Sequence, residues 1–410
     1  MGKNLFNSTR WIQIALINFS VVALAGITLR YKINFPLPFF NQKNVLHAHS
    51  HFAFTGWVTL VLIALLVNYL QQQKIKTNYN KYHWLLLANC IVAYGMLISF
   101  TVEGYAFYSI LFSTLSIFIS YFFIFYYWQD LSKVKDNSYA PTWFKAALIL
   151  WAFSSLGAFS LAFLMANHIN VQELYFGSIY FFLHFQYNGW FLFVCFGLFF
   201  SFLAQKKIAL LDSINKKIFL MMAITVVPTY FLSILWLKLP FSLYVIAGFS
   251  GILQMFVLFY FIKLLILLKG NIIQNFTSKY LLILASTAFI IKIILQLLSA
   301  IPYLSNYAFS YRPIVIGYLH LSFLGIISFF ILAYINEVLI AQGRRLSKTG
   351  VLIFTSGVIL QEIVLMIQGL EAMEFKPLPY ANLILFFLAI VIGIGISYIA
   401  LTMDKLSTRL

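Results

Sequence analysis

The chain has 410 residues, of which 62% are hydrophobic and 19% aromatic, whereas only 9% are charged. A soluble fold of this length has too little interior for so many apolar side chains, so the composition excludes a soluble globular protein and predicts an integral membrane protein. The 27 basic and 10 acidic residues give a net charge of +17. In a soluble chain that excess would suggest a nucleic-acid partner.

Apolar runs of about 20 residues or more recur along the chain, each long enough for an α-helix to cross about 30 Å of hydrocarbon. They predict an all-α fold with twelve transmembrane helices, over about 11–30, 42–70, 83–102, 105–128, 142–166, 175–204, 217–237, 242–268, 279–301, 313–341, 349–370 and 380–402. The connections are short, so we expect a single polytopic membrane domain over residues 1–410, without a soluble module.

The basic residues are distributed unevenly between the connections. If the N-terminus is cytoplasmic, most of them fall on cytoplasmic connections, and few, including Arg30, Lys32, Lys43 and Arg312, fall on outer ones. This asymmetry is typical of multi-pass membrane proteins. It accounts for the positive charge without a nucleic-acid partner and predicts both termini on the cytoplasmic side.

Five of the seven histidines lie inside predicted spans, where polar side chains are rare and usually functional. Three of them begin similar heptapeptides with the pattern H-[FL]-x-[FY]-x-G-[WI], at His51, His184 and His320. These copies lie on predicted helices 2, 6 and 10, four spans apart, which predicts a pseudo-threefold arrangement of four-helix units. All three helices enter from the outer face, so the histidines are expected at a similar depth in the outer half of the bilayer.

Helix 2 carries two further histidines. His47 and His51 are one helical turn apart and share a face, whereas His49 points to the other side. Imidazole is a common axial ligand of haem iron and a good ligand of copper, so this histidine layer predicts a haem or metal site. The candidate metal ligands are His47, His49, His51, His184 and His320.

Two features of this layer have simpler interpretations. Each histidine can be a hydrogen-bonded packing residue or line a polar pore. The glycine that follows each repeated histidine by five residues either permits close helix contact or makes room for a porphyrin.

Other polar residues also lie within or near the predicted spans. Lys292 and Glu362 fall near mid-membrane, where they are expected to pair with each other or to belong to a proton path. Arg312 begins helix 10 about two turns above His320, a position from which its guanidinium can meet a haem propionate.

Twelve helices with histidines on helices 2, 6 and 10 near the outer face resemble the catalytic subunit of haem-copper oxidases and nitric oxide reductases. By this resemblance, which covers the topology of the whole chain, His51 corresponds to the low-spin haem ligand, His184 to a copper ligand and His320 to a haem ligand. The stretch Leu46-His47-Ala48-His49-Ser50-His51 and the lone helix 10 histidine also resemble the NnrS family, membrane proteins associated with haem, copper and nitric-oxide stress. The motif resemblance covers about 25 residues, judged from the length of these motifs.

The resemblance implies haem, of b type, copper or both, in a bacterial-type cytoplasmic membrane. It also implies a separate electron donor, such as cytochrome c, a cupredoxin or a quinol, because the chain has no C-x-x-C-H signature.

The chain departs from the oxidase pattern at three places. Predicted helix 7 has no histidine where oxidases carry a His-His pair for copper, and Ser322 stands where the second histidine of an H-x-H pair would be. Asn188 occupies the position of the cross-linked tyrosine of many oxidases. We therefore expect one haem or one copper site rather than a full binuclear centre, and no four-electron oxygen reduction with proton pumping.

The leading hypothesis is a haem- and/or copper-binding membrane redox protein that handles electrons, oxygen or nitric oxide in the outer half of the bilayer. With a cofactor it would be an oxidoreductase of haem-copper oxidase type. The alternatives are a metal-ion or proton transporter with a histidine-lined path, in which Lys292 and Glu362 relay or gate, and a cofactor-poor accessory subunit.

Overall fold

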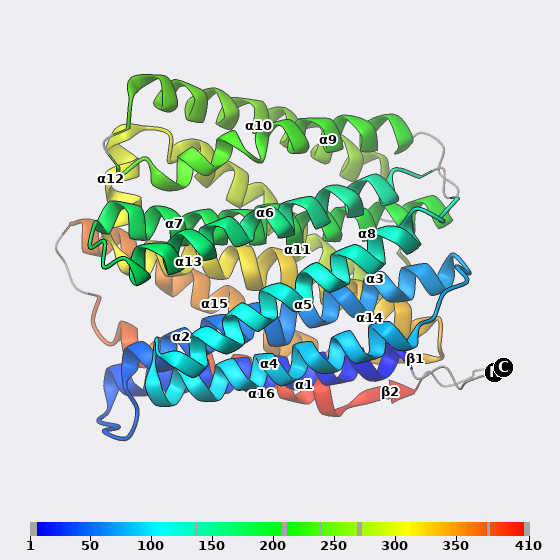
Figure 1. Ribbon diagram of the computed structural model, residues 1–410, viewed down its shortest axis with the longest axis horizontal. Coiled ribbons are helices and arrows are strands. Elements are labelled where there is room, and N and C mark those ends of the chain that lie inside the picture. Colours follow the sequence, from blue (N-terminus) through cyan, green and yellow to red (C-terminus); the bar gives the residue numbers. More distant parts are fainter. Residues whose placement is uncertain are drawn as a thin grey trace. The chain divides into compact units, whose positions relative to one another are not determined.

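A computed structural model describes residues 6–135, 138–206, 211–237, 239–268, 273–374 and 378–405 of the chain, and most of them are helical (Figure 1). Among these residues, eleven helices are long and apolar enough to cross a membrane, or twelve if one bent pair counts as a single span. The prediction of an all-α multi-pass membrane protein is therefore confirmed. The threefold arrangement of its helices stays a prediction.

The chain forms two compact units. The first unit comprises Met1–Val134, Ala333–Glu371 and Lys376–Leu410, and the second comprises Lys135–Leu332 and Ala372–Phe375. The three histidines of predicted helix 2 belong to the first unit, whereas His184 and His320 belong to the second. The single membrane domain expected from the short connections stays a prediction.

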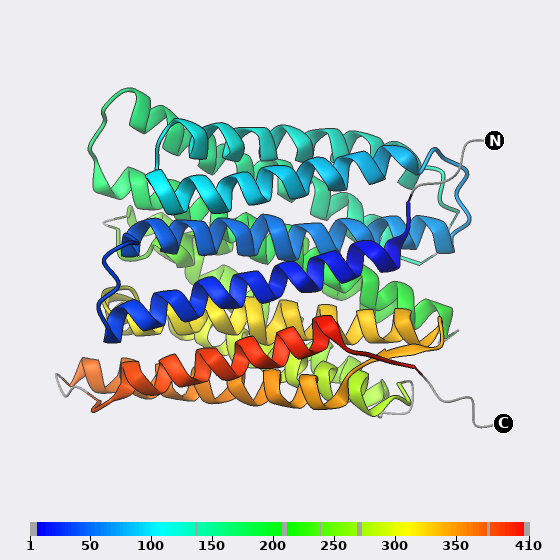
Figure 2. The ribbon, with the colours of Figure 1, turned by 90° about the horizontal axis from the view of Figure 1, so that it is seen from below.

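The first unit is built around one deeply buried span. This span, Gln42–Gln72, has 83% of its apolar stretch buried. The spans of the unit run side by side (Figure 2), and α1 packs along α16 from the far end of the sequence. The elements are α1 (Ser8–Asn34), α2 (Gln42–Phe52), η1 (Ala53–Thr59), α3 (Leu60–Gln72), α4 (Asn80–Glu103), α5 (Phe107–Leu131), most of α14 (Phe329–Ile340), β1 (Arg344–Leu346), α15 (Lys348–Met373), α16 (Ala381–Leu401) and β2 (Met403–Lys405). The antiparallel pair of β1 and β2 was not expected from the sequence.

The second unit also surrounds a buried span, Gln172–Gln205, with 83% of its apolar stretch buried. Its elements are α6 (Ala140–Ala166), α7 (Gln172–His184), η2 (Phe185–Phe191), α8 (Leu192–Gln205), α9 (Leu211–Thr225), η3 (Pro228–Ile234), α10 (Phe241–Leu268), α11 (Phe276–Leu298), α12 (Pro302–Ser310), α13 (Arg312–His320) and η4 (Leu321–Ser328). The most buried span of each unit therefore carries one copy of the histidine heptapeptide.

The seventh predicted span is broken. The sequence suggested one continuous helix over 217–237, but α9 ends at Thr225 and is followed by the 3₁₀ helix η3, with a bend of 54° between them. Pro228 explains the break, because it has no N–H and its ring collides with the carbonyl of the preceding turn. Within a membrane, irregular backbone persists only where protein groups or a polar cavity satisfy its freed polar atoms.

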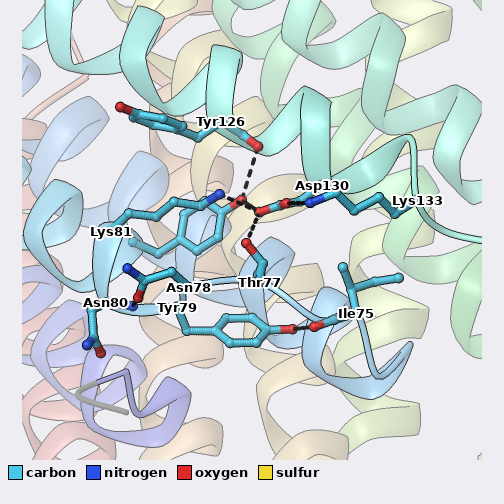
Figure 3. A network of polar contacts seen from close by, with 10 residues as sticks. Ile75, Thr77, Asn78, Tyr79, Asn80, Lys81, Tyr126, Asp130 and Lys133 are labelled. Atoms are coloured by element: carbon cyan, nitrogen blue, oxygen red, sulfur yellow. Dashed lines mark hydrogen bonds and ion pairs between the residues drawn. The ribbon is translucent and has the colours of Figure 1, made fainter. Parts of the chain in front are cut away.

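A buried carboxylate joins α4, α5 and the connection before α4 at one end of the first unit (Figure 3). Asp130 is fully buried and accepts from the ammonium groups of Lys81 and Lys133 at 2.7 and 2.6 Å. It also accepts from the hydroxyls of Tyr82 and Thr77 at 2.7 and 2.8 Å. Four donors, two of them charged, offset the cost of removing this carboxylate from water.

Candidate functional site

The three copies of the histidine heptapeptide share an unusual backbone. In each, a π-helix of seven or eight residues begins one or two residues after the histidine: η1 after His51, η2 after His184 and η4 after His320. π-Helices are rare, occur mostly as single turns within α-helices, and are frequent at functional sites. The repeat seen in the sequence therefore corresponds to a repeated local structure.

Side chains from neighbouring spans hydrogen-bond to carbonyls of the first π-helix. Asn18 on α1 donates to the carbonyl of Gly56 at 2.8 Å, and Asn89 on α4 donates to the carbonyl of Thr55 at 3.0 Å. The hydroxyl of Tyr94 donates to Oδ1 of Asn18 at 2.8 Å and orients that amide. Because an unsatisfied carbonyl in hydrocarbon costs several kcal/mol, these two asparagines stabilise η1.

The glycines of the heptapeptide lie at close packing contacts. A Cβ on Gly56 would lie 2.8 Å from the ring of Phe52, and a Cβ on Gly189 would lie 2.9 Å from Cβ of Leu150 on α6. A Cβ on Gly325 would lie 3.1 Å from the methyl group of Ala288 on α11. At Gly189 and Gly325 the structure supports close contact between helices, whereas at Gly56 the neighbouring ring belongs to the same span.

In the first unit, two histidines share an aromatic cluster. The ring of His51 stacks on Phe100 with centroids 4.3 Å apart, and its Nε2 lies 3.3 Å from the hydroxyl oxygen of Tyr105. The ring of His47 meets Tyr105 edge-on at a centroid distance of 4.6 Å, and its Nε2 is buried without a hydrogen-bond partner among the described residues. His49 points away, with Nδ1 3.1 Å from a backbone oxygen of α1. The predicted division of these three histidines between two faces is confirmed.

In the second unit, both ring nitrogens of the fully buried His184 are engaged. One bond joins Nε2 to the carbonyl oxygen of Val226 at 2.7 Å, and the other joins Nδ1 to Nδ2 of Asn188 at 3.1 Å. A carbonyl oxygen can only accept, so Nε2 carries the proton and Nδ1 of the neutral ring accepts from the amide. Copper, which the family resemblance implies at His184, does not fit this arrangement because neither nitrogen has a free lone pair.

A small cavity lies beside Asn188 in the second unit. Its polar wall consists of Asn188, Thr229, Gln254 and Lys292. Lys292 is 2% exposed and makes no ion pair with another described residue. The carboxamide oxygens of Asn188 and Gln254 are buried without a hydrogen-bond partner in the described part of the chain. Sequence reasoning singled out Lys292 but did not connect it with His184.

The remaining candidates lie on α13 and α15. His320 is the last residue of α13 and is half-buried, whereas Arg312 is the first residue of that helix and is exposed. Their roles as haem ligand and propionate partner stay predictions. The pairing of Lys292 with Glu362 also stays a prediction. Glu362 lies on α15 of the first unit.

Across the described ranges, no three or more His, Cys, Asp or Glu side chains are grouped so that they could hold a metal ion. Both ring nitrogens of His184 are engaged, and the predicted metal-ligand roles of the other four histidines stay predictions. No family model matches the chain, and no curated protein sequence is similar to it.

Proposed function

We propose that the chain is a membrane-embedded redox protein that binds haem, copper or both through His51 and His47 and handles electrons, oxygen or nitric oxide. The observation that carries this proposal is the buried Nε2 of His47, which has no hydrogen-bond partner among the described residues and lies in the aromatic cluster that also holds the imidazole of His51. A buried polar atom without a partner is costly in a membrane, and iron or copper would satisfy it. Imidazole nitrogen is a ligand that both metals accept.

The two imidazoles lie among aromatic rings. Phe100 and Tyr105 present aromatic rings beside both imidazoles, and the stack on Phe100 already fixes the plane of His51. The Tyr105 hydroxyl lies within reach of His51 Nε2 and can donate to a molecule bound there. In this proposal the haem is of b type, and a separate protein or quinol supplies electrons.

The test compares three variants on one helix. His51→Ala and His47→Ala remove the two imidazoles of the cluster, whereas His49→Gln alters a histidine that faces α1 and serves as the matched control. Absorption spectra before and after dithionite, with metal analysis, are recorded for each protein purified after expression with haem and copper supplied. We expect His51→Ala to lose the cofactor signal and His49→Gln to keep it. Cofactor content equal in His51→Ala, His47→Ala and the parent would contradict the assignment.

A separate observation favours a second candidate function, the transport of a metal ion or proton. The broken span of α9 and η3 contributes Val226 and Thr229 to the cavity that Lys292 lines. Discontinuous helices beside buried polar groups are typical of substrate sites in transporters. Transport predicts proton or divalent-metal flux in proteoliposomes that Lys292→Met abolishes and Lys263→Met, on the exposed face of α10, leaves intact. Equal flux in both variants would contradict it.

A further inference from the structure

The break in the seventh span provides a hydrogen-bond acceptor for His184. The helix α9 ends at Thr225, and in the 3₁₀ helix that follows the N–H of Tyr230 donates to the carbonyl of Val227 at 3.1 Å and not to that of Val226. The carbonyl of Val226 instead accepts from Nε2 of His184 at 2.7 Å and from the hydroxyl of Thr229 at 3.3 Å. This hydrogen bond therefore joins His184 on the sixth span to the backbone of the seventh span at its break.

This contact also fixes the orientation of Asn188. Because the carbonyl requires the proton on Nε2, Nδ1 of the neutral imidazole can only accept. Asn188 must therefore turn its NH2 group to His184, as it does at 3.1 Å, and its Oδ1 must point elsewhere. That oxygen is buried, has no hydrogen-bond partner among the described residues, and belongs to a residue that lines the cavity.

The other polar groups of the cavity include both a hydrogen-bond donor and a hydrogen-bond acceptor. Lys292 brings an amine whose protons need acceptors, and Gln254 brings a second buried carboxamide oxygen that needs a donor. The cavity has room for about one water molecule. A water there can donate to both amide oxygens and accept from the amine, which makes about three hydrogen bonds, the usual number for a buried water.

We propose that this cavity is a binding site for a single water molecule, which joins Lys292 through Asn188 to His184 and the carbonyl at the break. The site is one of hydrogen bonds and not of metal coordination. A metal cation would meet the lysine amine and only two amide oxygens, and an anion would meet the amide oxygens. The inference does not depend on a cofactor in the first unit.

Two measurements on the full chain test this proposal. The first is solid-state ¹⁵N NMR of protein labelled at histidine, with the His184 signals identified from their loss in His184→Gln. We expect a neutral ring protonated at Nε2 in membranes of neutral pH. A metal-bound shift, a doubly protonated ring or the Nδ1–H tautomer would overturn the proposal.

The second measurement is an experimental density map, at a resolution that shows ordered waters, of the parent protein, Lys292→Met and the control Lys263→Met. We expect one water peak in the cavity of the parent and of Lys263→Met, and none in Lys292→Met. A dry cavity in the parent, an anomalous metal signal, or a peak that requires chloride in the buffer would each overturn the proposal. If Lys292→Met does not fold, the parent map and the NMR spectrum still decide it.

Discussion

Replacement of Asp130 by asparagine should destabilise the first unit strongly. The carboxylate is fully buried and accepts from Lys81, Lys133, Tyr82 and Thr77 at 2.6 to 2.8 Å. An amide keeps the shape but loses the charge and replaces one acceptor oxygen with a donor. The Lys81 ammonium, at the end of a side chain that is 21% exposed, is then left without its counter-ion.

The size of the expected loss of stability depends on how deeply the lysine of each ion pair is buried. Breaking a buried ion pair by removing one charge costs about 3–5 kcal/mol, so we expect a loss of about 3 kcal/mol for Asp130→Asn. Lys133→Met should cost no more than about 1 kcal/mol, because its side chain is 54% exposed and water screens the pair. With an unfolding entropy of about 2.1 cal/mol/K per residue, a loss of about 3 kcal/mol lowers the thermal midpoint of a 410-residue chain by roughly 3–4 °C.

The assay is thermal unfolding in detergent, followed by intrinsic fluorescence, with Asp212→Asn as the matched control. Asp212 lies in the first turn of α9 and is exposed, so the same chemical change should leave the midpoint nearly unaltered there. Equal midpoints for Asp130→Asn and Asp212→Asn would refute the reasoning. So would a Lys133→Met loss as large as that of Asp130→Asn.

Three further substitutions test other contacts by the same unfolding assay. Asn89→Leu leaves the carbonyl of Thr55 without its donor and should cost about 1–3 kcal/mol; an unchanged midpoint would argue against support of η1 from α4. Gly189→Ala places a Cβ 2.9 Å from Leu150 and should cost about 1–3 kcal/mol, whereas Gly248→Ala, with open space around it, should be neutral or stabilising; equal effects would count against close packing. Lys292→Met removes the buried amine and, with it, the proposed water, which leaves the amide oxygens of Asn188 and Gln254 without a donor and should cost about 1–3 kcal/mol; an unchanged midpoint would contradict this.

The spans were largely predictable from the sequence, because hydropathy and length alone decide what can cross a bilayer. The faces of His47, His49 and His51 were predictable for a related reason, since they depend only on the local helical period. The break in the seventh span had a visible signal in Pro228, which lies in the middle of an apolar run and disfavours a continuous helix.

Other features depend on contacts between distant parts of the chain. Asp130 on α5 accepts from Tyr82 on α4 and from Thr77 in the connection before α4. The helix predicted over about 105–128 ended before Asp130. His184 meets Val226 only because the seventh span is broken and leaves that carbonyl available. The π-helices were not predictable from the sequence, because hydropathy does not report the register of backbone hydrogen bonds. The repeated glycine was the only sequence feature that coincided with them.

The measurement we would make first is the absorption spectrum of the purified parent protein, oxidised and dithionite-reduced, with iron and copper analysis of the same sample. A haem site at His51 predicts a Soret band that shifts on reduction, and a copper site predicts about one copper per chain that survives dialysis. Absence of both after expression with haem and copper supplied would contradict the proposed redox function and leave transport as the function to test.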